Sequence, residues 1–482
     1  MTLREGKAKF NMNIKYSRFI KNFSYTLVSN LIALLISSLV TFIVPKAISV
    51  ENYGYFQLYL FYATYVGFFH FGWMDGLFLR YGGAYYEKLD KGLFKGELKL
   101  YALVESVISV ALCFAAILFS KDINNMFILG VTALSIVLIN IRVYFMDILQ
   151  CTNRIKEYSI LSVVGRIFYL LMISALLLVG YRGFHLLIIA DILGRLVSTA
   201  YGALKCRDIF AAKSCDRRSA IEESVENIKV GVKLLFATIA SNSIIGIVRL
   251  GINSAWDVST FGRVSLTLSI SNLLMVFIRA VSLVLFPTLR RVDRERLDKM
   301  YGIMRVSLMV PMLGMLVLYY PIRVIVAAWL PQYAESLKYM ALLFPMCIFE
   351  SKMSMLVETY MKVLRKERSL MFVNIGTLLL SLVTTGFSCF LLQNLDIAVL
   401  SIVILLAFRC VVAELTLTKY VKQNLIHDVV MEISLTTAFI LASWYVGGFY
   451  GTAIYLAFYL VYVFIKRKEI ISLFKLIKRK PK

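Results

Sequence analysis

The sequence predicts an all-α integral membrane protein of about fourteen transmembrane helices, arranged as two pseudo-repeated six-helix lobes followed by a C-terminal helix pair. Three observations support this fold class. The 482 residues are 60% hydrophobic and only 17% charged, whereas soluble domains are about half apolar and about a quarter charged. Apolar windows of about 20 residues, enough for a membrane-crossing helix, recur along the chain. The intervals between them are too short for a soluble domain.

The apolar windows give the expected helices in chain order. A basic segment at 1–23 precedes the first window, which we expect to be retained because no small-residue cleavage site follows it. The first lobe is expected at 24–203 and the second at 230–418, joined by a basic linker at 204–229. The expected spans are 24–44, 55–79, 98–120, 125–148, 158–180, 183–203, 230–254, 260–289, 300–322, 334–360, 369–392, 397–418, 429–447 and 450–465.

The distribution of basic residues predicts the orientation. The chain closes with the helix pair at 429–465 and a basic tail at 466–482. Most of the 53 lysines and arginines lie at the two ends and in alternate loops, while the opposite loops carry only Lys46, Lys121, Arg182, Arg323 and Lys338. Because cytoplasmic loops are the basic ones, both termini are expected in the cytoplasm. The net charge of +24 is spread over these loops, which favours membrane lipids and excludes nucleic acid as a partner.

Seven basic residues lie deep within the expected spans: Arg142, Arg166, Arg195, Arg249, Arg279, Lys352 and Arg409. A central Arg or Lys facing lipid costs about 3 kcal/mol, so seven would exceed the roughly 5–15 kcal/mol by which a typical fold is stable. They must therefore face acids or water. Arg263 and Arg305 lie nearer to helix ends, where we expect them to snorkel to the interface. We assign five arginines to a cationic substrate cavity: Arg142, Arg249, Arg409, Arg166 and Arg279.

Intramembrane acids give a second set of candidates. Asp191 and Arg195 are four residues apart on one helix face, a spacing that favours a structural ion pair. Carboxylates that could carry a coupling proton or sodium ion are Asp75, Glu105, Asp191 and Glu414. The seven cysteines show no C-x-x-C spacing, and no phosphate-binding G-x-x-x-x-G-K-[ST] loop occurs. We therefore expect no metal site, no cofactor and no catalytic residue.

An internal repeat relates the two lobes. A shift of 208 positions lays SVENYGYFQLYL (49–60) on DVSTFGRVSLTL (257–268), with Gly54 on Gly262. Each segment follows one long span and begins the next, at the same place in each set of six spans. Transporters commonly pack two such repeats around a central site and expose it to either side in turn.

With the closing FPTLRR at 286–291, these segments resemble the O-antigen or polysaccharide flippases of the multidrug/oligosaccharidyl-lipid/polysaccharide (MOP) exporter superfamily. The resemblance covers the whole chain in topology. It implies two six-helix lobes that move an undecaprenyl-pyrophosphate-linked oligosaccharide across the bacterial inner membrane by alternating access, for O-antigen, lipopolysaccharide or capsule assembly. The implied cavity is cationic, and the implied partners are this lipid-linked oligosaccharide, a polysaccharide polymerase and a chain-length regulator.

Two alternatives remain open at this point. A membrane-embedded glycan polymerase or glycosyltransferase also has many spans and a cationic pocket, although such enzymes usually carry a large exterior loop with acids, and the longest one here, about 321–338, has only Glu335. A MATE-like exporter of small molecules shares the repeat. An acidic cavity would favour export of drug-like cations, and the intramembrane surplus here is basic.

Overall fold

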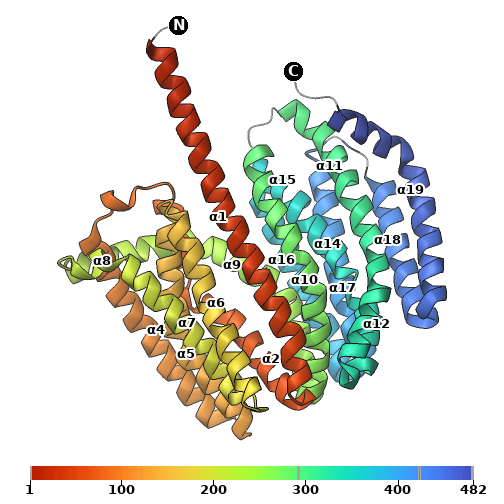
Figure 1. Cartoon of the computed structure of the whole chain (residues 1–482), viewed down its shortest axis with the longest axis horizontal. Coiled ribbons are helices and arrows are strands. Elements are labelled where there is room, and N and C mark those ends of the chain that lie inside the picture. Colours follow the sequence, from red (N-terminus) through yellow and green to blue (C-terminus); the bar gives the residue numbers. More distant parts are fainter. Residues whose placement is uncertain (1–2, 121, 290–293, 422, 424, 479–482) are drawn as a thin grey trace. The chain divides into compact units, whose positions relative to one another are not determined.

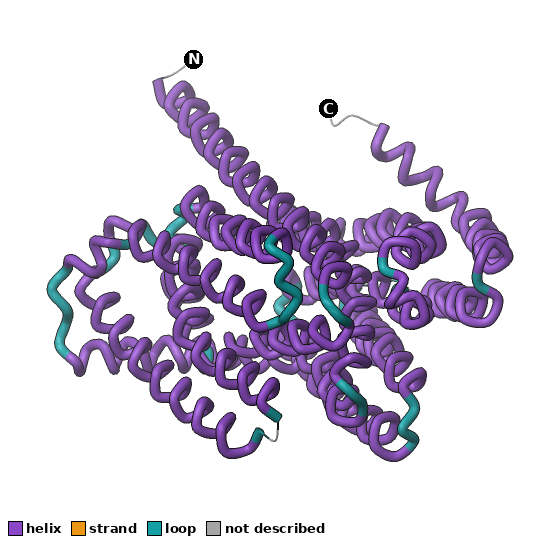
Figure 2. Tube along the Cα trace, turned by 60° about the horizontal axis from the view of Figure 1, so that its bottom comes forward, coloured by secondary structure: helices purple, strands orange, loops and turns teal. Residues whose placement is uncertain are grey.

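The described part of the chain is helical throughout. The computed structural model describes residues 3–120, 122–289, 294–421, 423 and 425–478. Within these ranges every regular element is a helix, and most helices are joined by connections of a few residues (Figure 2). The predicted all-α class is therefore confirmed.

The chain forms two compact units, Met1–Ile239 (unit 1) and Ala240–Lys482 (unit 2). Helix α9, Arg217–Ala255, begins in unit 1 and ends in unit 2. The boundary therefore falls inside a helix. The segment 204–229, expected as a linker, belongs to unit 1, and the C-terminal helix pair belongs to unit 2.

Unit 1 contains the helices from α1 to α8 and the first part of α9, most of which are labelled in Figure 1. They are α1 (Leu3–Ala47), α2 (Val50–Tyr65), α3 (Trp73–Tyr81), α4 (Lys91–Phe119), α5 (Ile123–Cys151), α6 (Ile155–Leu178), α7 (His185–Lys205), α8 (Arg207–Ala211) and the first part of α9. Side-chain caps begin several of them. Asp90 accepts a hydrogen bond from the Leu93 amide at 3.0 Å, and Asp122 accepts one from the Asn125 amide at 3.1 Å, which satisfies amides that have no intrahelical acceptor.

The expected span at 55–79 is wrong as a continuous helix. Helix α2 gives way to a 3₁₀ turn at Val66–His70, and α3 starts only at Trp73. Between them Phe71 and Gly72 have φ values of 51° and 83°, a left-handed conformation that a helix cannot accommodate. A Cβ on Gly72 would also lie 2.6 Å from the amide nitrogen of Val232 in α9, so the break is fixed by a close backbone crossing that hydropathy does not reveal.

Unit 2 contains more interruptions than unit 1. After the end of α9 come α10 (Val258–Leu289), α11 (Arg294–Met315), α12 (Tyr319–Trp329), α13 (Lys338–Leu343), α14 (Met346–Lys352), α15 (Glu358–Val363), α16 (Glu367–Thr385), α17 (Leu395–Thr418), α18 (Ile426–Leu441) and α19 (Gly448–Lys478). Short 3₁₀ turns occupy Leu316–Leu318 and Pro331–Leu337. Stretches of π-helix occupy Met353–Val357, Gly386–Leu391 and Ala442–Val446.

The two repeat segments begin helices at equivalent places. Helix α2 starts at Val50 and α10 starts at Val258, which is the offset that the sequence repeat predicts. Gly54 and Gly262 are both buried in their own units. The internal repeat thus corresponds to matching local structure in each unit.

The outer surfaces of both units are apolar. Twelve helices in the described part of the chain are long and apolar enough to cross a membrane. Their outward residues include Leu118 and Phe119 in unit 1 and Val324 and Leu391 in unit 2, all strongly exposed. Contiguous exposed apolar surface of this extent marks contact with lipid. The protein is therefore a multi-pass membrane protein.

Each unit has its own core. In unit 1 the core contains the aromatic rings of Trp73, Tyr101, Tyr144 and Phe145, which pack edge to face or stacked among α3, α4 and α5, and Leu161 of α6. In unit 2 it is aliphatic and sulfur-rich and is centred on α17, with residues such as Ile402 and Leu406 fully or almost fully buried. Charged and polar side chains also lie between the helices of each unit, and they define the candidate sites.

Candidate functional site

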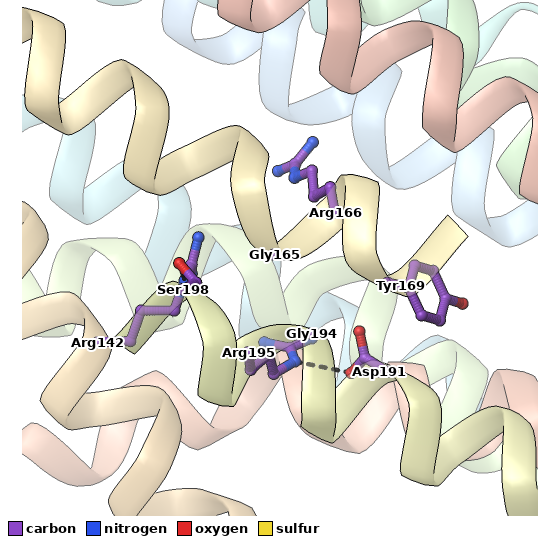
Figure 3. A pocket seen from close by; sticks show the side chains of 8 residues that line it. All are labelled: Arg142, Gly165, Arg166, Tyr169, Asp191, Gly194, Arg195 and Ser198. Atoms are coloured by element: carbon purple, nitrogen blue, oxygen red, sulfur yellow. Dashed lines mark hydrogen bonds and ion pairs between the residues drawn. The ribbon is translucent and has the colours of Figure 1, made fainter. Parts of the chain in front are cut away.

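Unit 1 contains a small polar pocket among α5, α6 and α7. It encloses about 120 Å³. Its lining is Arg142, Gly165, Arg166, Tyr169, Asp191, Gly194, Arg195 and Ser198, and Figure 3 shows the side chains of these residues from the three helices. We call this site the arginine pocket. It brings together Arg142 and Arg166, both expected in a cationic cavity, with Asp191 and Arg195, expected as an ion pair.

A pair of glycines lets the helices of this pocket approach. A Cβ on Gly165 of α6 would lie 2.3 Å from the carbonyl oxygen of Gly194 in α7, and one on Gly194 would lie 2.6 Å from the carbonyl oxygen of Gly165. No other residue fits at either position without moving a backbone. The next residue on each helix is an arginine, so this crossing places Arg166 and Arg195 at the same pocket.

One of the three guanidinium groups is neutralised. Arg195 donates from Nε to Oδ2 of Asp191 at 2.7 Å. The Tyr59 hydroxyl donates to the same oxygen at 2.8 Å. Asp191 therefore has two donors from within unit 1, and the carboxylate is held as a structural partner. Tyr59 was not predicted from the sequence. It lies 132 residues from Asp191, and no sequence pattern indicates that the two side chains meet.

The other two guanidinium groups have no carboxylate partner among the described residues. Arg142 donates from Nε to the Ser198 hydroxyl at 2.8 Å, and this hydroxyl in turn donates to the carbonyl of Leu161 at 2.7 Å. Ser198 thus orients Arg142 without neutralising it. Arg166 is exposed and makes no hydrogen bond or ion pair within the described part of the chain. Its side chain projects from α6 in Figure 3 without a dashed contact.

The charge of the pocket favours an anion. Three guanidinium groups and one carboxylate line it, which gives a net charge of +2. Guanidinium groups bind phosphate and carboxylate oxygens through parallel N–H donors and stay charged at all physiological pH values. Tyr169 adds an aromatic ring to the lining. The pocket can therefore hold a doubly charged anionic group, with Arg142 and Arg166 as its free donors.

Unit 2 holds basic residues of a different kind, in a buried ion network. Arg305 is 2% exposed and contacts three carboxylates, Glu414 at 2.8 Å, Asp428 at 2.9 Å and Glu432 at 2.8 Å. Lys352, also 2% exposed, contacts Glu414 and lies 2.7 Å from Glu432. The expectation that Arg305 snorkels to the interface is therefore wrong. Three acids on α17 and α18 draw its guanidinium inward, and pairing offsets the cost of burial.

The network joins the C-terminal helix pair to the rest of unit 2. Lys466 of α19 contacts Asp428 of α18 at 2.6 Å, and Tyr301 of α11 donates to Glu414 of α17 at 2.9 Å. Glu432, Asp428 and Lys466 were not among the residues singled out from the sequence. An acid inside the apolar window at 429–447 is the signal that could have identified Glu432.

Arg409 is also enclosed by partners. Its guanidinium lies 3.2 Å from Glu350 and 3.0 Å from Glu358. It also donates to the amide oxygen of Asn374 and to the Ser241 hydroxyl, both at 2.9 Å. With two carboxylates around a side chain that is 3% exposed, this arginine has the environment of a structural ion pair. It does not line the arginine pocket.

The remaining candidates are dispersed. Arg249 donates to the Ser265 hydroxyl at 3.0 Å and lies over the Phe261 ring at 5.1 Å, within unit 2. The side chain of Arg279 lies outside the described residues. In unit 1, Asp75 lies 3.9 Å from the Nε2 atom of His70, and Glu105 accepts a hydrogen bond from Asn140 at 2.8 Å. Glu414 belongs to the ion network. Among the described residues, no group of three or more His, Cys, Asp and Glu side chains could hold a metal ion.

Comparison with known proteins identifies the fold. No protein-family model matches the chain. No curated protein matches it either. Among solved structures, the lipid II flippase MurJ in an inward closed conformation is 14% identical, with a TM-score of 0.64 and coverage of 94% of this chain and 100% of that chain. An inward-facing multidrug resistance MATE transporter of the MOP superfamily is 13% identical, with a TM-score of 0.60 and coverage of 85% and 95%.

A third similar structure is a MOP superfamily transporter from Pyrococcus furiosus described as having a binding pocket of reverse polarity. It is 14% identical, with a TM-score of 0.53 and coverage of 84% of this chain and 97% of that chain. At such low identities the likeness establishes the fold alone. The protein thus has the fold of MOP superfamily transporters, and these structural neighbours are transporters and a flippase rather than enzymes.

Proposed function

We propose that the protein is a flippase that carries a polyprenyl-pyrophosphate-linked oligosaccharide across the bacterial inner membrane by alternating access, for O-antigen or capsule assembly. One observation carries the proposal: Arg142 and Arg166 line a pocket without carboxylate partners, beside an Arg195 that is already neutralised. A pyrophosphate offers several anionic oxygens, to which guanidinium groups donate in pairs. The pocket's surplus charge of two matches such a group.

In this proposal each part of the substrate has its own environment. The polyprenyl tail stays in lipid, the pyrophosphate binds Arg142 and Arg166, and the ring of Tyr169 offers flat surface to the first sugar. Ser198 and Asp191 position the guanidinium groups. Arg249 and Arg279 remain proposed as further cationic contacts, whereas the two carboxylates around Arg409 favour a structural role for it.

The proposal extends to orientation and coupling. The basic loops support cytoplasmic termini. Asp75 and Glu105 are the proposed carriers of a coupling ion, because neither contacts an arginine or lysine among the described residues, whereas Asp191 and Glu414 do. A polymerase and a chain-length regulator are proposed as partners that receive the exported unit.

The test measures translocation of a labelled polyprenyl-pyrophosphate oligosaccharide in inverted membrane vesicles at matched expression. We expect Arg142→Gln and Arg166→Gln each to lower the initial rate at least tenfold, since each removes one of two free donors at a phosphate. Arg218→Gln is the matched control. It lies in the same unit, its side chain is 88% exposed and it pairs with Glu222, so its rate should equal that of the wild type.

The same experiment separates the alternatives. Unchanged rates in both pocket variants would remove the arginine pocket from the mechanism. Joining of glycans in place of translocation would indicate a polymerase or glycosyltransferase. Wild-type vesicles that move an organic cation and leave the lipid-linked oligosaccharide in place would instead indicate a MATE-like exporter, a function that the fold allows but that the basic lining of the pocket disfavours.

A further inference from the structure

Unit 2 contains a second cavity, far in sequence from the arginine pocket. It encloses about 470 Å³, within the range of about 300–1,000 Å³ that is typical of small-molecule sites. Its polar and aromatic lining is Thr260, Arg263, Glu335, Ser336, Lys338 and Tyr339. These residues come from the first turns of α10 and α13 and from the 3₁₀ turn before α13. The charge distribution of the loops predicts that these helix ends lie on the non-cytoplasmic side.

Arg263 is the cation without a matched anion in this cavity. Its Nε atom is buried and has no hydrogen-bond partner among the described residues. Asp257 lies near enough to respond to its charge, but it uses Oδ1 to accept from the Thr260 amide at 2.9 Å. Although partial burial alone would raise it, the pKa of Asp257 is lowered by the hydrogen bonds of Thr260 and by the charge of Arg263. Arg263 therefore keeps unused donors toward the cavity.

Lys338 is already matched. Its Nζ lies 3.4 Å from Oδ1 of Asp396 and above the rings of Tyr339 at 4.9 Å and Trp444 at 5.4 Å. These contacts fix the ammonium beside two aromatic rings. Glu335 is exposed, and its carboxylate has no hydrogen bond or ion pair within the described part of the chain, so it supplies a free acceptor to the same cavity.

The combination selects the ligand's chemistry. The guanidinium group of Arg263 favours a carboxylate ligand, which can accept two parallel N–H hydrogen bonds. A simple inorganic anion would be repelled by Glu335, whereas a ring with hydroxyl groups can donate to it. Tyr339 adds flat apolar surface with a polar edge, which suits a sugar ring. We propose that this cavity binds a pyranose that carries a carboxylate, with the carboxylate on Arg263 and ring hydroxyls on Glu335.

The site is independent of the arginine pocket, because its ligand contacts involve no phosphate and no residue of unit 1. The probe is a free disaccharide of galacturonic acid. It is titrated calorimetrically into the full chain, which is held in nanodiscs whose lipids carry no net charge. We expect saturable binding that weakens at least tenfold when the same disaccharide is supplied as its methyl ester, which keeps the hydroxyls and removes the charge. This arm requires no variant and therefore cannot fail through misfolding.

Arg263→Gln should weaken binding of the acid at least tenfold and bring it to the level of the ester. Arg323→Gln, at another arginine of unit 2 outside the lining, should leave both affinities unchanged. Equal binding of acid and ester, or an unchanged affinity in Arg263→Gln, would overturn the proposal, and so would equally tight binding of L-glutamate or inorganic phosphate. Because the probe has no lipid carrier, these outcomes are separate from success or failure of the flippase test.

Discussion

The arginine pocket of unit 1 and the ion network of unit 2 give their basic residues opposite environments. In the arginine pocket of unit 1, three guanidinium groups share one carboxylate. In the ion network of unit 2, Arg305 alone contacts three carboxylates, and Lys352 contacts two. Burial of a charge is tolerated where it is paired, so the ion network uses Arg305 and Lys352 to hold helices of unit 2 together. Unit 1 leaves two of its own cations available to a ligand.

The difference teaches that the state of pairing, rather than the presence of an intramembrane arginine, marks a binding site. Arg142 and Arg409 both lie deep within apolar windows of the sequence. Arg409 has Glu350 and Glu358 at ion-pair distance, whereas Arg142 has a serine hydroxyl. The carboxylates around Arg409 come from α14 and α15, far from it in sequence, and only the fold brings them together.

The largest expected effect is at the centre of the ion network. Arg305→Met removes the cation that Glu414, Asp428 and Glu432 share, leaves Lys352 and Lys466 as their remaining cations, and largely keeps the volume of the side chain. The network is then short of one positive charge, and removing one partner of a buried ion pair costs about 3–5 kcal/mol. We expect a large fall in the thermal midpoint of the purified protein in detergent. Intrinsic fluorescence during heating measures this midpoint.

A second substitution tests whether charge is the cause. Arg305→Met combined with Glu432→Gln restores the balance of charge and should recover a substantial part of the lost midpoint. If Arg305→Met unfolds at the wild-type temperature, the network is not stabilising and the contrast between the units fails. If the double variant is no better than the single one, packing rather than charge is lost.

An intermediate effect is expected at the glycine crossing of unit 1. Gly165→Ala places a Cβ 2.3 Å from the Gly194 carbonyl oxygen, so α6 and α7 must separate. Overpacking of this kind costs about 1–3 kcal/mol, and it also moves Arg166 away from Arg195. We expect a lower thermal midpoint together with weaker binding of inorganic pyrophosphate in calorimetry.

Gly376→Ala is the matched control for the glycine prediction, since nothing lies within 4 Å of a Cβ at Gly376. Gly376→Ala should leave the thermal midpoint unchanged or raise it slightly, because alanine has a higher helix propensity than glycine and the residue lies in a helix. A Gly165→Ala protein with wild-type stability and pyrophosphate binding would show that the crossing does not position the pocket.

The sequence alone predicts the fold class. It says less about which side chains contact one another. Hydropathy and the repeat at Gly54 and Gly262 depend on local composition, so they predicted membrane helices and matching starts of α2 and α10. The break after Val66 was missed because it depends on a close crossing between Gly72 and Val232. Similarly, Arg305 was placed at an interface because its three acids are distant in sequence. Only the pair Asp191 and Arg195 was accessible from spacing, since both lie on one helix.

The smallest expected effect on stability is at Arg166, and it is the sharpest test of the contrast. Because this side chain is exposed and makes no hydrogen bond or ion pair within the described part of the chain, Arg166→Gln should change the free energy of unfolding by no more than about 0.5 kcal/mol. The same variant should lose most of the pyrophosphate affinity that calorimetry measures in the wild type. A residue whose loss weakens binding but not stability acts on a ligand. A fall in the thermal midpoint as large as that of Arg305→Met would instead mean that Arg166 has a structural role. The arginine pocket would then use its cations for stability, as the ion network does.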